Sequence, residues 1–123
     1  MRVGACTSSA AVWSRAYIGI MTEAKPASIA IYRRGPAWID GKALRDQPTL
    51  LDHGRFLGEL EQTGRAVHAG PMYRLDDVPT ADPIGIASFP ADVDAARLIL
   101  RDDPALVSGL LLCDVLAWHV ADA

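Results

Sequence analysis

From residue 28 onward the chain alternates between two hydrophobic patterns. Apolar residues spaced by three and four predict one helix from residue 49 to a stop at Gly64 and another from Pro90 to Pro104. Alternation and short apolar runs predict four strands, at residues 28–33, 65–69, 83–89 and 111–120. The order β-α-β-β-α-β is that of the ferredoxin-like split βαβ unit, an α+β sandwich with an antiparallel sheet.

The first predicted helix carries a histidine on its apolar face. Leu50, His53 and Leu57 share one stripe, which turns the imidazole toward the sheet rather than toward bulk water. Thr49 and Asp52 have the spacing of a capping box, with Asp in place of the usual Glu or Gln. We therefore expect the helix to begin at Thr49.

Two glycines interrupt the same predicted helix. Gly54 and Gly58 each cost about 1 kcal/mol relative to Ala in a helix interior. Because residues four apart share a helix face, both glycines lie on one side. The close approach of another backbone would account for them.

The first residues differ in composition from the remainder. Residues 1–26 are rich in Ala, Ser and Gly without clear periodicity, so we expect a loose N-terminal extension before a domain over residues 27–123. Ser8, Ser9, Ser14 and Arg15 interrupt any signal-peptide core. No apolar run has the roughly 20 residues of a membrane helix. With two distant cysteines and no CxxC spacing, these observations predict a cytoplasmic protein without a membrane association.

The charge distribution argues against a nucleic-acid partner. The formal net charge is −3, whereas nucleic-acid binding depends on phosphate neutralisation by Lys and Arg. The charge is uneven, because residues 1–45 carry a net +5 and the remainder a net −8. The basic segment either attracts a small anion or packs against the acidic remainder, and solvated charges are the commoner case.

Several short motifs, taken in order, resemble the YCII-related family. The family has a His in the first helix, a later Ala-Gly-Pro stretch, an Asp-Pro after the second helix and an aromatic residue near the end of the last strand. A subgroup also has GPAW after the first strand and Gln-Pro before the helix. The matching residues run from about Ser28 to Val120, and they are His53, Ala69-Gly70-Pro71, Asp103-Pro104, Trp118, Gly35-Pro36-Ala37-Trp38 and Gln47-Pro48.

The resemblance implies a homodimeric α/β barrel in which two sheets pack face to face. It also implies a catalytic His/Asp pair, which falls on His53 and Asp103, and no cofactor. Most of the family has no assigned reaction. A few members act in the breakdown of aromatic compounds, and related barrels include muconolactone isomerase-like enzymes.

Each half of this pair also has a structural interpretation. His53 is either an acid–base group, since imidazoles titrate near neutral pH, or a core histidine bonded to a backbone carbonyl. Asp103 either orients the imidazole or ends a helix in an Asp-Pro turn, and Asp102 is its rival. In an ideal split βαβ unit the two positions lie at opposite helix ends, so direct contact requires a short second helix or a chain that folds back.

The remaining candidates would hold a ligand. Arg34 ends the first predicted strand and could bind an anionic group, although a solvated strand end is the simpler interpretation; Arg33 points to the opposite face. Trp38 lies in the GPAW motif as a core anchor, and Gly70 and Pro71 lie in the Ala-Gly-Pro stretch. The three histidines lack HxH or HxxxH spacing, so no metal site is expected, and His68 and His119 are predicted surface residues.

Two functions fit the sequence. One is a cofactor-free isomerase- or lyase-like enzyme that acts on a small cyclic or aromatic-derived molecule, with His53, Asp103 and Arg34 in the site. The other is a non-catalytic dimeric module that binds a small ligand or serves as an accessory domain, with His53 buried and inert.

Overall fold

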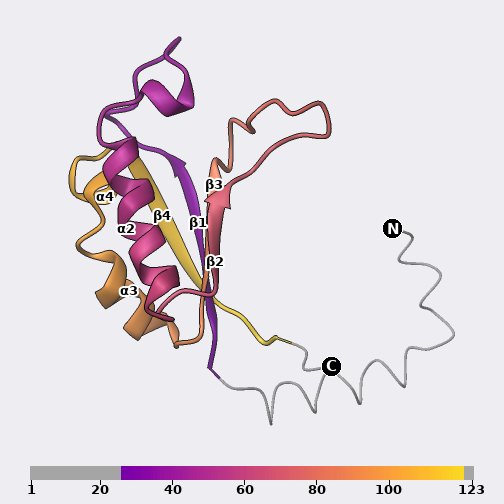
Figure 1. Cartoon of the computed structure of the whole chain (residues 1–123), viewed down its shortest axis with the longest axis vertical. Helices are drawn as coiled ribbons and strands as arrows, with labels where there is room; N and C mark the ends of the chain where they lie inside the picture. The colour runs from indigo at the N-terminus through magenta and orange to yellow at the C-terminus, as the bar shows by residue number, and fades with distance from the viewer. Residues whose placement is uncertain (1–25, 121–123) are drawn as a thin grey trace, which may run out of the picture. The chain divides into compact units, whose positions relative to one another are not determined.

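A four-stranded antiparallel sheet carries the fold of residues 26–120, the part of the chain that the computed structural model describes (Figure 1). The strand order is β2-β3-β1-β4, which is compatible with a ferredoxin-like fold. The predicted extension over residues 1–26 lies outside the described residues, apart from Pro26. The strands are β1 (Ser28–Arg34), β2 (His68–Pro71), β3 (Gly85–Phe89) and β4 (Leu111–Ala117).

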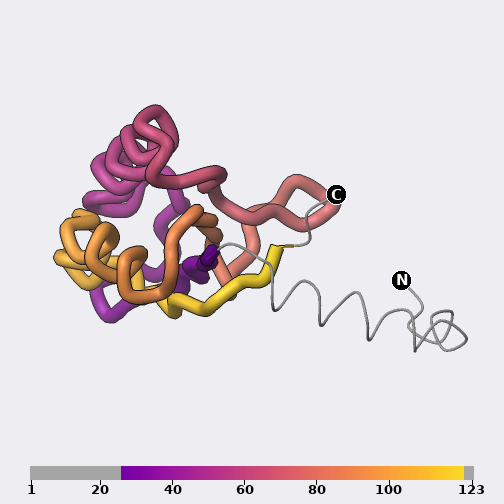
Figure 2. Tube along the Cα trace, turned by 90° about the horizontal axis from the view of Figure 1, so that it is seen from below, coloured from indigo at the N-terminus to yellow at the C-terminus, as the bar shows by residue number. Residues whose placement is uncertain are grey.

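The helices lie together on one side of this sheet (Figures 1 and 2). In the chain, β1 is followed by a 3₁₀ turn, η2 (Leu44–Asp46), and then by α2 (Leu50–Gln62), which leads to β2. Between β3 and β4 the chain forms two short helices, α3 (Val93–Leu100) and α4 (Pro104–Val107). No helix in the described ranges is long and apolar enough to cross a membrane.

Alternation along the strands separates a buried face from an open one. Ala30 and Tyr32 of β1 face the helices and are buried with Ala87 and Phe89 of β3. The register with β4 places Leu111 on the same side. These side chains pack under the apolar face of α2, so the core lies between the sheet and the helices.

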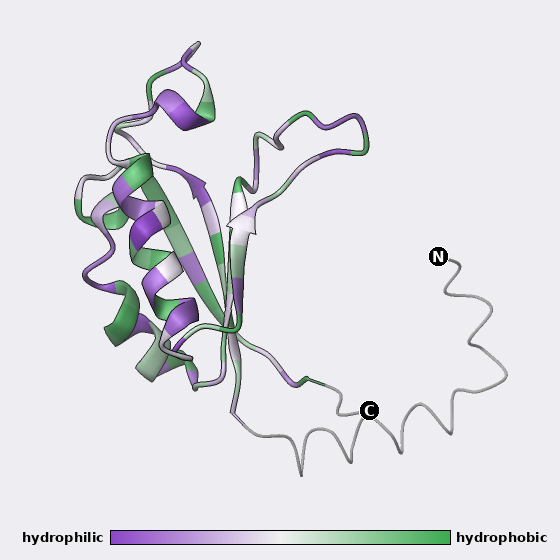
Figure 3. Cartoon of the chain, viewed as in Figure 1, coloured by the Kyte–Doolittle hydropathy of each residue, from purple (hydrophilic) through white to green (hydrophobic). Residues whose placement is uncertain are grey.

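The open face carries exposed apolar side chains. Ile29 and Ile31 of β1 are half-buried there, and the cross-strand register pairs Ile29 with Leu116 of β4. Leu112 of β4 lies on the same face opposite Arg33. Leu112 is 54 % exposed and Leu116 51 % exposed. Figure 3 shows that β4 is largely hydrophobic along its length.

Several predicted boundaries move in the structure. The second strand begins at His68 rather than at residue 65, and the second helix begins after Asp92, whose side chain accepts a hydrogen bond from the backbone of Ala95. The capping-box prediction is wrong. Thr49 has a left-handed backbone (φ 66°) and makes no side-chain cap, and its hydroxyl instead lies 3.0 Å from that of Ser108.

Between β2 and β3 a long loop projects away from the helices (Figures 1 and 2). A single bridge between Tyr73 and Pro79 joins its two sides. Tyr73 and Leu75 near its end are exposed. At its base, Asp82 forms an ion pair with Arg33 on the open face of the sheet.

Candidate functional site

His53 and Asp103 meet beneath the start of α2. The imidazole Nδ1 lies 2.9 Å from Oδ1 and 2.8 Å from Oδ2 of the carboxyl group. His53 is 9 % exposed and Asp103 is fully buried. Because an ionised carboxylate only accepts hydrogen bonds, this pairing places the ring proton on Nδ1. In the neutral ring with this tautomer, Nε2 carries no proton and can take one up, which is the arrangement of an oriented general base.

In an ideal split βαβ unit His53 and Asp103 would lie at opposite helix ends, but here they meet because the second helix is short. α3 has only 8 residues, and after the turn at residues 101–102 the chain begins the separate helix α4. Asp103 is the N-cap of α4, where its Oδ1 accepts a hydrogen bond from the backbone N–H of Ala105 at 2.9 Å. α4 packs against α2 and brings this cap to His53. The rival Asp102 is exposed.

Tyr32 is a third member of the cluster that the sequence did not single out. Its hydroxyl donates to Oδ2 of Asp103 at 3.3 Å, and its ring meets the His53 ring edge-on at 5.0 Å and 77°. Burial, and next the Asp103 carboxylate, raise the pKa of the phenol far above its ordinary value, so the hydroxyl keeps its proton. One feature of the sequence could have indicated this role. The alternation of buried and partly exposed positions along β1 puts Tyr32 on the buried face, where a phenol needs a hydrogen-bond partner.

A pocket of about 270 Å³ opens beside His53, between α2 and the β2-β3 side of the sheet. Its walls are largely apolar and include Leu44, Leu50 and Ile84. Glu61 is a further ionisable residue in the lining. A small apolar pocket with one oriented imidazole has the usual composition of a small-molecule site.

Gly54 and Gly58 also line this pocket, which corrects the prediction about them. Among the described residues, no atom lies within 4 Å of a Cβ built on either glycine. No other backbone within the described part of the chain approaches them. Close contacts of this kind lie elsewhere, at Gly35, where an added Cβ would meet the carbonyl oxygen of Gly109, and at Gly85, where it would meet that of Gly70.

The predicted ligand-binding residues divide into two groups. Gly70 and Pro71 line the pocket together with His53. Arg34 and Trp38 are not part of its lining; the Arg34 guanidinium lies 5.1 Å from the centre of the Trp38 ring, in a cation–π pair after the end of β1. Trp38 is half-buried against the core, as its role as an anchor requires.

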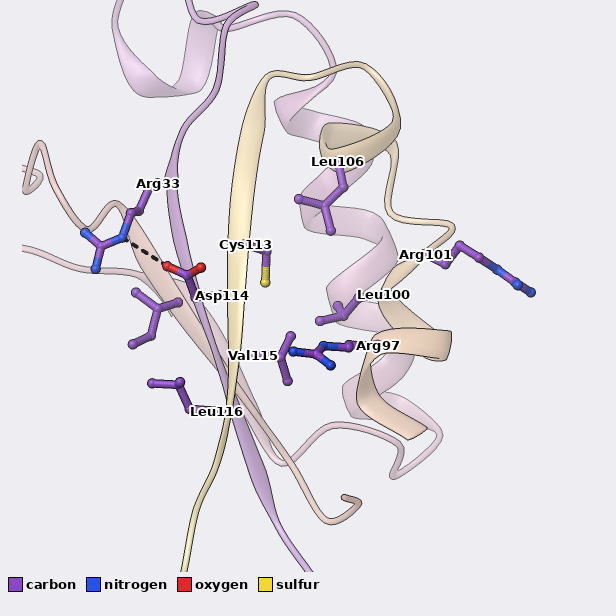
Figure 4. A pocket seen from close by; sticks show the side chains of 10 residues that line it. Arg33, Arg97, Leu100, Arg101, Leu106, Cys113, Asp114, Val115 and Leu116 are labelled. Carbon is purple, nitrogen blue, oxygen red and sulfur yellow. Dashed lines mark hydrogen bonds and ion pairs between the residues drawn. The ribbon is translucent and has the colours of Figure 1, made fainter. Parts of the chain in front are cut away.

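A second hollow, of about 430 Å³, follows the outer edge of β4 (Figure 4). Its lining comes from both faces of the strand: Cys113 and Val115 point toward the helices, whereas Asp114 points to the other side, toward Arg33. Burial, and next Asp103, raise the pKa of the Cys113 thiol to about 12, so the thiol is not an activated nucleophile. The lining side chains therefore do not converge on one reacting position.

His68 and His119 are exposed, and within residues 26–120 no cluster of His, Cys, Asp and Glu is arranged to hold a metal ion. The chemistry-bearing groups that the fold gathers are thus His53, Asp103 and Tyr32. Comparisons of the chain with protein-family models, with curated proteins and with solved structures found no match.

Proposed function

We propose that this chain is a cofactor-free acid–base enzyme of the YCII-related kind, which rearranges a small cyclic or aromatic-derived molecule in an isomerisation or elimination. The observation that carries the proposal is the buried pair of His53 Nδ1 and the Asp103 carboxylate, 2.8 Å apart, at the wall of an apolar pocket. A core histidine bonded to a backbone carbonyl would lack this partner.

Each member of the cluster has a separate role in the proposed reaction. In an isomerisation, Nε2 of His53 removes a proton from one position of the bound molecule and returns it to another. In an elimination, the C–H electron pair forms the double bond as the leaving group departs, and the imidazolium returns its proton to that group. Neither route consumes an oxidant or a reductant. The Asp103 carboxylate fixes the tautomer and stabilises the imidazolium that forms between the two transfers. Tyr32 holds the second carboxylate oxygen and does not itself exchange a proton.

The experiment is a turnover screen with matched variants. Small cyclic lactones and uncharged hydroxylated aromatic compounds are incubated with the wild-type chain, with His53→Gln and with Asp102→Asn. We expect His53→Gln to lower turnover by about 10²- to 10⁴-fold, the usual contribution of a general base, and Asp102→Asn to leave it unchanged. A substrate that is turned over equally by wild type and His53→Gln contradicts the proposal.

NMR spectroscopy provides a second readout that needs no substrate. The Nδ1–H of His53 is expected as a slowly exchanging resonance that Asp103→Asn removes, because a buried proton held by a carboxylate is protected. Binding of small molecules without any turnover, with this resonance present, would instead favour the non-catalytic ligand-binding module.

We further propose a homodimer formed through the open sheet face, as in a dimeric ferredoxin-like α/β barrel. The support is the set of apolar side chains on that face, where half-exposed Leu116 lies opposite Ile29 and half-exposed Leu112 lies further along the same strand. Large apolar patches are unusual on the surface of a monomer.

Sedimentation tests the homodimer with two charged variants. We expect Leu116→Glu on the open face to give monomers at concentrations where wild type is dimeric. Leu98→Glu changes an exposed leucine on α3, in the helix layer, and is the matched control that should leave the dimer intact. A wild-type monomer at micromolar concentration would refute the dimer.

A further inference from the structure

The side of α2 that faces the pocket carries two glycines among residues with larger side chains. Residues at spacings of three and four contribute to the lining, which is the pattern of one helix face. Within this set, the two glycines stand four apart at the middle. The six lining residues of α2 are Leu50, His53, Gly54, Leu57, Gly58 and Glu61.

Packing within the described chain gives no reason for these glycines. A Cβ at Gly54 or Gly58 would meet no described atom within 4 Å, and neither residue has a positive φ that would strain another side chain. Ala is more favourable than Gly in a helix interior. Stability alone would therefore favour Ala at both positions, so the open space itself requires an explanation.

We propose that Gly54 and Gly58 keep this space open for a flat, uncharged molecule that carries a hydroxyl group and lies against α2 beside His53. The inference rests on the proposed function in using the same pocket. The two glycines are separated by about 6 Å along the helix axis, roughly the width of one aromatic ring.

The lining chemistry sets the ligand class. The apolar walls favour a molecule with little polar surface, and the volume of about 270 Å³ is at the small end for ligand sites. With the Nδ1 proton directed to Asp103, Nε2 of His53 is an acceptor that suits a hydroxyl donor. Glu61 in the lining disfavours an anion.

The probe is 2-naphthol, titrated by its fluorescence into the full-length chain. We expect the double variant Gly54→Ala/Gly58→Ala to bind the probe at least tenfold more weakly than wild type, while its urea midpoint stays the same or rises. Glu59→Ala alters a residue of α2 that is outside the lining, and it should bind like wild type. This combination of greater stability with weaker binding is the opposite of what damage to the fold produces.

Two related compounds test the ligand class. Naphthalene, which lacks the hydroxyl, should bind several-fold more weakly than 2-naphthol, and 2-naphthoate, an anion, at least tenfold more weakly. Failure of wild type to bind 2-naphthol, or equal binding of all three compounds, overturns the inferred class.

Two further outcomes overturn the role of the glycines. One is unchanged 2-naphthol affinity in the double variant. The other is a change in sedimentation without a change in affinity, because the glycines would then face a second copy of the chain. Glycine-dependent binding without any turnover would refute the proposed enzyme and leave this inference standing. Turnover that requires His53 but is unchanged in the double glycine variant would support the proposed enzyme and refute the role of the glycines.

Discussion

Replacing Asp103 by Ala should be among the most destabilising single changes in this chain. The fully buried carboxylate accepts from the hydroxyl of Tyr32, from the ring of His53 and from the backbone N–H of Ala105. The two side-chain donors left without an acceptor cost about 1–3 kcal/mol each, and the lost bond from Ala105, which is the cap of α4, costs about 1 kcal/mol. Because water can enter the space left behind, we expect a total of about 3–5 kcal/mol, the usual cost of breaking a buried pair.

Equilibrium urea unfolding of three variants measures this cost. Asp102→Ala is the matched control, since its neighbouring carboxylate is exposed, and it should lie within about 0.5 kcal/mol of wild type. Asp103→Asn should lose less than Asp103→Ala, because the amide oxygen can still cap α4. Its NH₂ group would donate to the ring of His53 and move the ring proton to Nε2, so catalysis should suffer more than stability. An Asp103→Ala loss no greater than that of Asp102→Ala would refute the anchoring role.

Three further predictions concern the buried side of the sheet. Gly35→Ala should lower the free energy of unfolding in urea by about 1–3 kcal/mol, because its Cβ would meet the Gly109 carbonyl. Gly70→Ala is the matched control in the same assay and should not show this loss, since a Cβ at Gly70 would lie in open space. Tyr32→Phe should cost about 1 kcal/mol, the worth of one hydrogen bond; no change in urea would show that the 3.3 Å contact contributes nothing. Stability should fall as pH rises from about 9 toward 12, because the folded state holds the Cys113 proton, with its pKa of about 12, after the unfolded thiol has lost its own. Above about pH 10 the raised pKa of Tyr32 acts in the same direction. Cys113→Ala should flatten this decline in unfolding experiments at several pH values, and an equally steep decline in the variant would exclude the thiol as its source.

The strands and the inner position of His53 were predictable because they depend on local periodicity. Alternation over residues 28–33 and the three-to-four spacing around His53 each report which side of an element is buried. The contact between His53 and Asp103 was not predictable from topology, because it depends on where α3 ends. Pro104 was expected to end a helix, with room for one more turn after it; it also begins α4, and a helix of four residues leaves little periodic signal.

The Gly54 and Gly58 pattern was visible in the sequence, but its meaning was not. Glycines on one helix face are as consistent with a packed backbone as with an empty space. Only the three-dimensional surroundings distinguish the two cases, and here the surroundings are open. The role of Tyr32 was hidden for a similar reason, since its partner Asp103 is 71 residues away in the chain.

The position of β4 at the edge of the sheet bears on how the chain behaves at high concentration. Its outer side has no neighbouring strand within the described residues, and its sequence LLCDVLA contains a single charge, on Asp114. Seven-residue apolar segments of this kind template intermolecular β-pairing when exposed, and a central charge is a common protection against it. Arg33 pairs with Asp114 at 3.4 Å and offsets part of that charge. We therefore expect the carboxylate of Asp114 to oppose aggregation through the last strand, independently of any role in a site.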